Sequence, residues 1–150
     1  MVASSEDGGE QPQRVRIICL DAHGAILLIK WRDPLDGHVF WEPPGGGIEE
    51  GETPRQAAVR ELFEETGLDS TLSLEFQLVE RDYTFAGRHH RHIEAFFHTR
   101  TGASPRPTAF TDEEMETYVE ARFWSRNDLD QLDSSLQPPE LSEILDRMIG

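Results

Sequence analysis

Hydrophobic positions along the chain fall into short blocks separated by polar residues, a pattern typical of strands. The first two blocks flank the tetrapeptide DAHG at residues 21–24, which predicts a β-hairpin. In the second half of the chain, two alternating blocks are joined by residues 81–91, which we expect to form the strand ends and the turn. We predict strands at residues 15–20, 25–31, 71–79, 92–100 and 118–124.

Residues 54–66 carry helix signals at both ends. Thr53 suits the N-cap, Pro54 suits the first helical position, and Gln56 completes a capping-box pattern. Gly67 stands where a left-handed C-cap belongs. We therefore predict a helix over residues 54–66.

The remaining segments predict two loops and two C-terminal helices. PPGGG at residues 43–47 holds prolines and glycines that exclude regular structure but let the backbone approach a ligand or metal closely. Residues 101–117 lack periodicity and predict a long loop. Ser125 begins a short predicted helix that ends at Leu132, and residues 138–149 predict an amphipathic one. This order of elements predicts an α/β fold, a mixed sheet covered by helices on two faces.

Length and composition indicate one domain. The chain has 150 residues, 37% of them hydrophobic, which suits a single domain over residues 13–150. Residues 1–12 are rich in Gly, Ser, Glu and Gln and predict a disordered tail without the basic and apolar regions of a signal peptide. No stretch approaches the roughly 18 apolar residues of a membrane span. We therefore expect a cytoplasmic protein that does not associate with membranes.

The net charge of −15 arises from 29 acidic against 14 basic residues. Such a field repels phosphate backbones, so we expect no non-specific nucleic-acid binding. An acidic protein that acts on a phosphate compound needs cations between the like charges, which points to a divalent metal, although the charge alone also keeps a small protein in solution. The single Cys19 lies in an apolar block and predicts a buried, inert thiol.

Three glutamates lie on adjacent turns of the predicted helix. At about 100° per residue, Glu61, Glu64 and Glu65 project from one face. Like charges at this spacing cost roughly 0.2–0.5 kcal/mol per pair, which an exposed face tolerates, so a solvated acidic face is one interpretation. Hard oxygen ligands grouped so closely also suit Mg²⁺ or Mn²⁺. Glycines 45–47 lack side chains that would block an ion, although a plain turn explains them equally well.

The residues around these glutamates follow a fixed spacing. They read Gly46-x5-Glu52-x7-Arg60-Glu61-Leu62-x-Glu64-Glu65-x-Gly67-Leu68. This spacing resembles the complete Nudix box, with every constrained position matched. The resemblance covers residues 46–68 directly and implies a Nudix-type α/β/α sandwich, a mixed β-sheet flanked by helices, over about residues 14–149.

The resemblance implies a metal-dependent pyrophosphohydrolase. Its substrate would be a small nucleotide-type molecule, a nucleoside diphosphate linked to another moiety X, hydrolysed by water attack on phosphorus with Mg²⁺ or Mn²⁺ as cofactor. Glu64 and Glu65 are the expected metal ligands, and the resemblance assigns a backbone carbonyl ligand to Gly45. Glu61 is either a third ligand or the group that orients and deprotonates the water.

Arg60 and Glu52 have a supporting role in this interpretation. Arg60 lies two turns beyond the start of the predicted helix, so its guanidinium can reach back to Glu52. A paired carboxylate and guanidinium would fix the loop onto the helix. We expect both residues to orient the site rather than to transfer protons.

Further site residues are expected outside the box. Members of the family often add a carboxylate from a loop or strand, and the acidic residues available here are Glu113, Glu114, Glu116 and Glu120. We rank Glu120, close to the start of the last predicted strand, slightly ahead of the others. A solvated acidic loop explains any one of them as well.

The HHRH cluster at residues 89–92 supplies positive charge to an otherwise acidic chain. A solvated strand end is the simplest interpretation, and Arg88 and Arg91 are candidates for phosphate contact. Zinc is disfavoured because no Cys or acidic residue completes a site. The aromatic residues Trp31, Trp41, Tyr83 and Phe85 can either stack on a nucleobase or belong to the core.

The sequence leaves the substrate open. Thr84 stands about where a proline would indicate ADP-ribose, Tyr83 is near the position for diadenosine polyphosphates, and the Pro-rich motif for NADH is absent. A non-catalytic Nudix domain that senses a nucleotide and regulates a partner is the alternative, but such a domain would be expected to lose box carboxylates. A purely metal-binding acidic protein would leave the Gly, Arg and cap positions unexplained. The resemblance also makes a homodimer one expected assembly.

Overall fold

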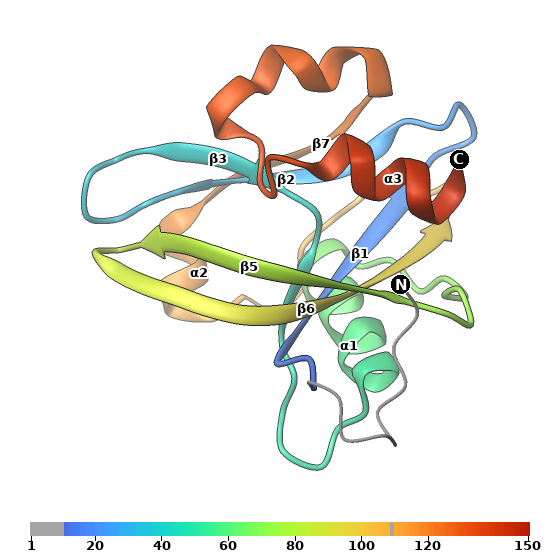
Figure 1. The fold of residues 1–150 in the computed structure, drawn as a ribbon, viewed down its shortest axis with the longest axis horizontal. Coiled ribbons are helices and arrows are strands. Elements are labelled where there is room, and N and C mark those ends of the chain that lie inside the picture. The colour runs from blue at the N-terminus through green and yellow to red at the C-terminus, as the bar shows by residue number, and fades with distance from the viewer. Residues whose placement is uncertain (1–10, 109) are drawn as a thin grey trace.

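A computed structural model of the chain describes residues 11–108 and 110–150 (Figure 1). Its elements are β1 (Arg14–Leu20), β2 (Ile26–Arg32), β3 (Val39–Glu42), β4 (Gly45–Gly47), α1 (Pro54–Thr66), β5 (Gln77–Phe85), β6 (Arg88–Arg100), α2 (Asp112–Thr117), β7 (Tyr118–Trp124), the 3-10 helix η2 (Arg126–Ser135) and α3 (Leu141–Ile149). Residues 1–10, which make up most of the predicted disordered tail, lie outside the described residues. None of the helices in the described part is long and apolar enough to cross a membrane.

The strands of the described segments form one mixed sheet in the order β3-β2-β1-β6-β5, with β4 joined to β1 and β7 joined to β2. β1 and β6 run parallel, and the other pairs are antiparallel. The predicted β1–β2 hairpin is present, but its register includes only Leu20 opposite Ile26. The other end of β1 pairs with β4 instead. β2, β3 and β7 therefore separate from β1, β5 and β6 beyond the Leu20–Ile26 pair, so that the sheet has two halves (Figure 1).

Helices cover both faces of this sheet, which confirms the predicted fold class. Side chains alternate across a strand, and along β1 the residues Val15 and Ile17 pack with α1 whereas Ile18 and Leu20 pack with α3 and η2. Cys19 is buried in the α1 layer, where burial raises the pKa of its thiol to about 12. The predicted inert, buried thiol agrees with this environment.

Helix α1 has the predicted ends. The Thr53 hydroxyl accepts the Gln56 N–H at 3.1 Å, and the Gln56 side chain accepts the Thr53 N–H at 2.9 Å, completing the capping box. Gly67 closes the helix with a left-handed φ of 72°. These local interactions fix which residues face the rest of the molecule.

Several sequence predictions are corrected by the structure. The sequence predicted no regular structure in PPGGG, but its three glycines form strand β4 because they pair with β1. Residues 71–76 lie outside the sheet, and β5 instead continues to Phe85, where Ala86 and Gly87 make the turn with φ of 53° and 77°. Within the predicted loop 101–117, residues Asp112–Thr117 form helix α2. Its signal in the sequence is a second capping box, TDEE, that begins at Thr111.

Candidate active site

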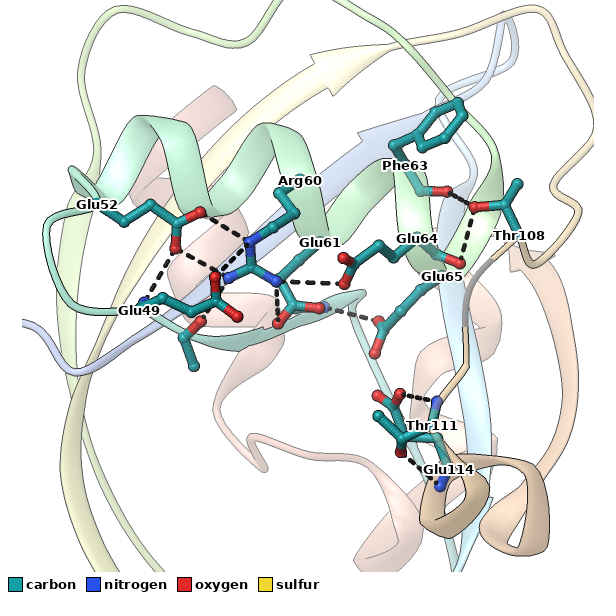
Figure 2. Close-up of polar contacts among 12 residues, drawn as sticks. Glu49, Glu52, Arg60, Glu61, Phe63, Glu64, Glu65, Thr108, Thr111 and Glu114 are labelled. Atoms are coloured by element: carbon teal, nitrogen blue, oxygen red, sulfur yellow. Dashed lines mark hydrogen bonds and ion pairs between the residues drawn. The ribbon is translucent and has the colours of Figure 1, made fainter.

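A cavity of about 1030 Å³ lies where the two halves of the sheet diverge. Its wall includes the box residues of β4 and α1, the basic ends of β1, β5 and β6, the β2–β3 hairpin, and α2. The loop before α2 reaches it because Thr108 bonds to the C-terminal end of α1. The Thr108 amide donates to the Glu64 carbonyl at 2.9 Å and its hydroxyl donates to the Phe63 carbonyl at 2.9 Å (Figure 2).

The box glutamates project from one face of α1, as predicted (Figure 2). They differ in burial. Glu65 is 3% exposed and its Oε1 accepts the Gly45 N–H at 3.0 Å. Glu61 is 8% exposed and lies against Gly46, where an added Cβ would overlap its carboxyl group. Glu64 is only half-buried. Alanine at position 46 would therefore displace the Glu61 carboxyl group, and this is an effect of close packing because the φ of Gly46 is not positive.

Arg60 ties the glutamates to the loop that precedes α1 (Figure 2). Its Nε donates to Glu52 Oε2 at 2.7 Å and its Nη2 donates to Glu52 Oε1 at 2.9 Å, a bidentate pair. Nη2 also donates to the Gly47 carbonyl at 2.9 Å, and Nη1 donates to Glu64 at 3.2 Å. The hydrogen bond from Arg60 lowers the pKa of Glu52. The contact expected between Arg60 and Glu52 is thus present.

The carboxylates of the box glutamates on α1 suit a hard divalent cation as ligands. Burial raises the pKa of Glu65 well above its usual range, although the hydrogen bond from Gly45 and the charge of Arg16 act in the opposite direction. Burial also raises the pKa of Glu61, against the opposing charge of Arg60. A cation would compensate these buried carboxylates. Within residues 11–108 and 110–150, no three His, Cys, Asp or Glu side chains form a ready-made metal cluster, and Arg60 contacts both Glu61 and Glu64.

Acidic residues of α2 extend the cavity wall. Glu113, Glu114 and Glu116 line the cavity. Burial is the largest cause of the raised pKa of Glu61, and the charges of Glu64 and Glu114 raise it further, against the charge of Arg60. Glu120, which the sequence ranked first, is exposed on β7 opposite Lys30 and is not among the described residues that line the cavity.

Sequence reasoning missed a buried ionic network beside the box. Glu94 on β6 is fully buried and lies 3.1 Å from Arg81 Nη1 and 3.4 Å from Arg16 Nε. Arg16 also donates to the Pro43 carbonyl at 2.9 Å and pairs with Glu42 at 3.1 Å. The signal was available, because Arg16 and Glu94 lie within the apolar runs VRIICL and IEAFF, and charged residues are almost never fully buried unless paired.

The structure separates the two arginines proposed for phosphate contact. Arg88 lines the cavity, as do Trp31, Tyr83 and Phe85. Arg91 lies outside this cavity wall, 3.7 Å from Asp82. Trp41 belongs to the core and packs edge-to-face on Trp124 at 5.1 Å.

Comparisons with known proteins agree with this geometry. The family model described as NUDIX domain matches residues 10–147. An 8-oxo-dGTP diphosphatase of Proteus vulgaris is 43% identical over 69 residues, which cover 45% of this chain and 59% of that protein. An RNA pyrophosphohydrolase of Photobacterium profundum is 44% identical over 62 residues, which cover 41% of this chain and 33% of that protein. In both cases the chain spans less than two thirds of the relative's length.

The fold is also found among solved structures. The MutT protein of Methanosarcina mazei Go1 superimposes with a TM-score of 0.69, covering 91% of this chain and 93% of that chain. The two sequences are only 17% identical, so this likeness concerns the fold alone.

Proposed function

Because the chain belongs to the Nudix family, we propose that it hydrolyses the diphosphate linkage of a nucleoside diphosphate joined to another moiety X. The observation that carries the proposal is the arrangement at α1, where buried Glu61 and Glu65 meet the glycines of β4 and Arg60 holds the loop in place. The names of the relatives, 8-oxo-dGTP diphosphatase and RNA pyrophosphohydrolase, support a nucleotide-type substrate.

The reaction is a substitution at phosphorus. Water attacks one phosphorus of the anhydride, the P–O bond to the bridging oxygen breaks, and each product keeps one of the two phosphoryl groups. Bound Mg²⁺ or Mn²⁺ would neutralise the diphosphate and lower the pKa of a water molecule. Glu64, Glu65 and the Gly45 carbonyl are the proposed ligands. Glu61 either completes this set or orients the attacking water and accepts its proton.

For the carboxylate from outside the box we favour Glu114 over Glu120. Glu114 lines the cavity and acts electrostatically on Glu61, whereas Glu120 lies on the exposed side of β7. Capping of α2 by Thr111 and Glu114 places these acids on a short, ordered helix. The cytoplasmic location, the homodimer and the single domain over residues 13–150 stay predictions.

The test is a phosphate-release screen over nucleoside triphosphates, nucleotide sugars and dinucleoside polyphosphates, with Mg²⁺ and Mn²⁺. Glu64→Gln and Glu65→Gln should each lower turnover by roughly two orders of magnitude or more and weaken Mn²⁺ binding, while thermal melting shows that the fold persists. Glu50→Gln is the matched control, because it removes the same charge from an exposed position of the box loop. Near-normal rates in both ligand variants would refute the assignment.

The alternative function is nucleotide sensing without catalysis. Binding without turnover across the whole screen would establish it. Binding of metal alone, with neither nucleotide binding nor hydrolysis, would instead point to a metal-binding acidic protein.

A further inference from the structure

Two hairpins from opposite halves of the sheet meet at their tips beside the cavity. The β2–β3 hairpin turns at residues 33–38, and the β5–β6 hairpin turns at Ala86 and Gly87. Strand β1 lies between the two hairpins in the sheet, but both tips lie on the same side of the molecule, away from α1 (Figure 1). Residues of both tips line the cavity. A contact between the tips therefore bridges this part of the cavity wall.

The carboxylate of Asp33 joins the two tips. Its Oδ2 accepts the Ala86 N–H of the other hairpin at 2.9 Å, and its Oδ1 accepts the Leu35 N–H of its own hairpin at 2.9 Å. Asp33 is only 6% exposed, although residues 34–38, which follow it, are all exposed. The hydrogen bond from Ala86 is the largest cause of a lowered pKa of Asp33, so the carboxylate stays ionised at neutral pH. Hydrogen bonds to an ionised acceptor are among the stronger ones in proteins.

Two apolar contacts accompany this hydrogen bond. Phe40 of β3 meets Phe85 of β5 edge to face, with ring centroids 5.8 Å apart. Leu35 lies so close to Gly87 that a Cβ at position 87 would be 2.9 Å from Leu35 Cδ2. We call the three contacts together the hairpin clasp: Asp33 with Ala86, Phe40 with Phe85, and Leu35 with Gly87. The clasp combines a directional bond with apolar packing, and it holds the two tips in one relative position.

We propose that Asp33 is a positioning residue for substrate binding, which keeps the two hairpin tips together so that the cavity is formed before the nucleotide enters. This inference deepens the proposed function and rests on it, because the substrate concerned is the nucleotide of that proposal. The β2–β3 hairpin contributes His38 and Phe40 to the cavity wall, and the β5–β6 hairpin contributes Tyr83 and Phe85. Without the clasp, these side chains would have to be brought together during binding, and the cost of ordering them would weaken affinity.

Loss of the clasp should weaken binding and leave the chemical step unchanged. When a binding site is formed for only a fraction of the time, its apparent affinity falls in proportion to that fraction. A hydrogen bond to a charged group is strong enough that its loss can lower this fraction to about a tenth. The tips lie away from α1, which carries the box glutamates, so the reacting phosphorus should keep its surroundings (Figure 1). The expected result is a KM raised about tenfold with kcat unchanged.

The test replaces Asp33 with asparagine. Asparagine has nearly the same shape, but one of its two terminal atoms is an NH₂ donor, so it cannot accept from both Ala86 and Leu35. Asp36→Asn is the matched control, because Asp36 lies in the same loop and its carboxylate accepts the His38 N–H at 2.8 Å within the hairpin. Asp36 is also not among the described residues that line the cavity. Unfolding in urea shows whether both variants fold.

The first measurement is amide hydrogen exchange by NMR on the full chain, without metal or nucleotide. The Ala86 amide should exchange at least about tenfold faster in Asp33→Asn than in wild type, whereas Asp36→Asn should match wild type. Equal exchange at Ala86 in all three proteins would overturn the inference, because Asp33 would then not hold the tips together. This measurement does not require hydrolysis, so it tests the clasp separately from the proposed function.

The second measurement is steady-state turnover with Mn²⁺, using the nucleoside triphosphate, nucleotide sugar or dinucleoside polyphosphate that wild type hydrolyses fastest. Asp33→Asn should raise KM about tenfold at unchanged kcat, and Asp36→Asn should change neither. An unchanged KM, or a change in kcat alone, would overturn the role of Asp33 while leaving the proposed hydrolysis in place.

Calorimetry replaces KM if wild type binds one of these nucleotides without hydrolysing it. A Kd that is about tenfold weaker in Asp33→Asn would then support the clasp and overturn the proposed hydrolysis. Absence of both binding and turnover in wild type would overturn the clasp's role in binding together with the proposed function.

Discussion

The three consecutive glycines of β4 should respond very differently to replacement by alanine. None of them has a positive φ, so alanine is compatible with each backbone conformation. What differs is the space for a methyl group. At Gly46 the methyl would overlap the Glu61 carboxyl group, whose farther oxygen Oε1 would be only 2.9 Å away. At Gly45 it would overlap the Val15 carbonyl of the neighbouring strand, whereas at Gly47 the nearest atom is 4.0 Å away.

These contacts set the expected magnitudes. Glu61 must move by at least about 1 Å to reach a normal contact distance from a methyl group at position 46. A misplacement of this size at a reacting centre costs about 100-fold in rate, or about 2.7 kcal/mol of transition-state stabilisation. Gly45→Ala instead forces the β1 and β4 backbones apart and should destabilise the fold by about 1–3 kcal/mol. Gly47→Ala should change stability by less than about 0.5 kcal/mol.

The assay measures unfolding in urea, Mn²⁺ affinity and turnover for all three variants. Gly46→Ala should unfold close to wild type but lose turnover and Mn²⁺ affinity, because Glu61 is displaced. Gly45→Ala should unfold at lower urea concentration, and Gly47→Ala should match wild type in every measurement. The reasoning is refuted if Gly46→Ala keeps both turnover and Mn²⁺ affinity, or if Gly47→Ala is as damaging as Gly46→Ala.

Two further predictions concern the charged residues that support the site. Glu94→Gln should lower the free energy of unfolding at pH 7 by about 3–5 kcal/mol, because Arg16 and Arg81 lose their shared carboxylate. Burial opposes ionisation of Glu94, but the charge of Arg16 and the other basic neighbours outweigh burial and hold its pKa well below the usual range. The contribution of ionised Glu94 to stability is therefore fully present above about pH 4.3 and is lost as the pH falls below that value. On the acid side, the free energy of unfolding should consequently decline less steeply with pH in Glu94→Gln than in wild type. Equal declines in urea titrations of the two proteins would contradict this. Arg60→Ala should lower the free energy of unfolding by about 1.5–3 kcal/mol and reduce turnover, because Glu52 and the Gly47 carbonyl lose their donor. Arg60→Lys should restore only part of the stability and of the turnover, since lysine cannot form the bidentate pair with Glu52. Full restoration by lysine would argue against the bidentate pair as the cause.

Helix α1 and its glutamates could be predicted because their determinants are local. The capping box at Thr53, Pro54 at the start and Gly67 at the end are all encoded within 15 residues of sequence. The helical period alone then places the glutamates on one face. The contact between Arg60 and Glu52 follows from the same period, since both residues lie within two turns of the helix start.

The remaining parts of the site depend on pairing between distant segments. The glycines of β4 become a strand only because β1 is available as a partner, about 30 residues earlier in the sequence. The buried ionic network combines Arg16 of β1, Arg81 of β5 and Glu94 of β6, which no short window of the sequence contains. Helix α2 had a local signal in its capping box. The contacts of Thr108, in the segment before α2, with Phe63 and Glu64 of α1 cannot be derived from spacing.

Arg16 connects the loop of Gly45 to the buried ionic network. Its guanidinium donates to the Pro43 carbonyl, two residues before the proposed ligand Gly45, and at the same time pairs with Glu42 and Glu94. A buried ionic network that is replaced as a whole by apolar residues of similar size is often neutral for stability, whereas removal of one partner leaves a buried charge uncompensated. Apolar residues would fill the same space, but they could not donate to the Pro43 carbonyl. The network is therefore better explained by the position it gives to the loop of Gly45 than by the stability of the fold.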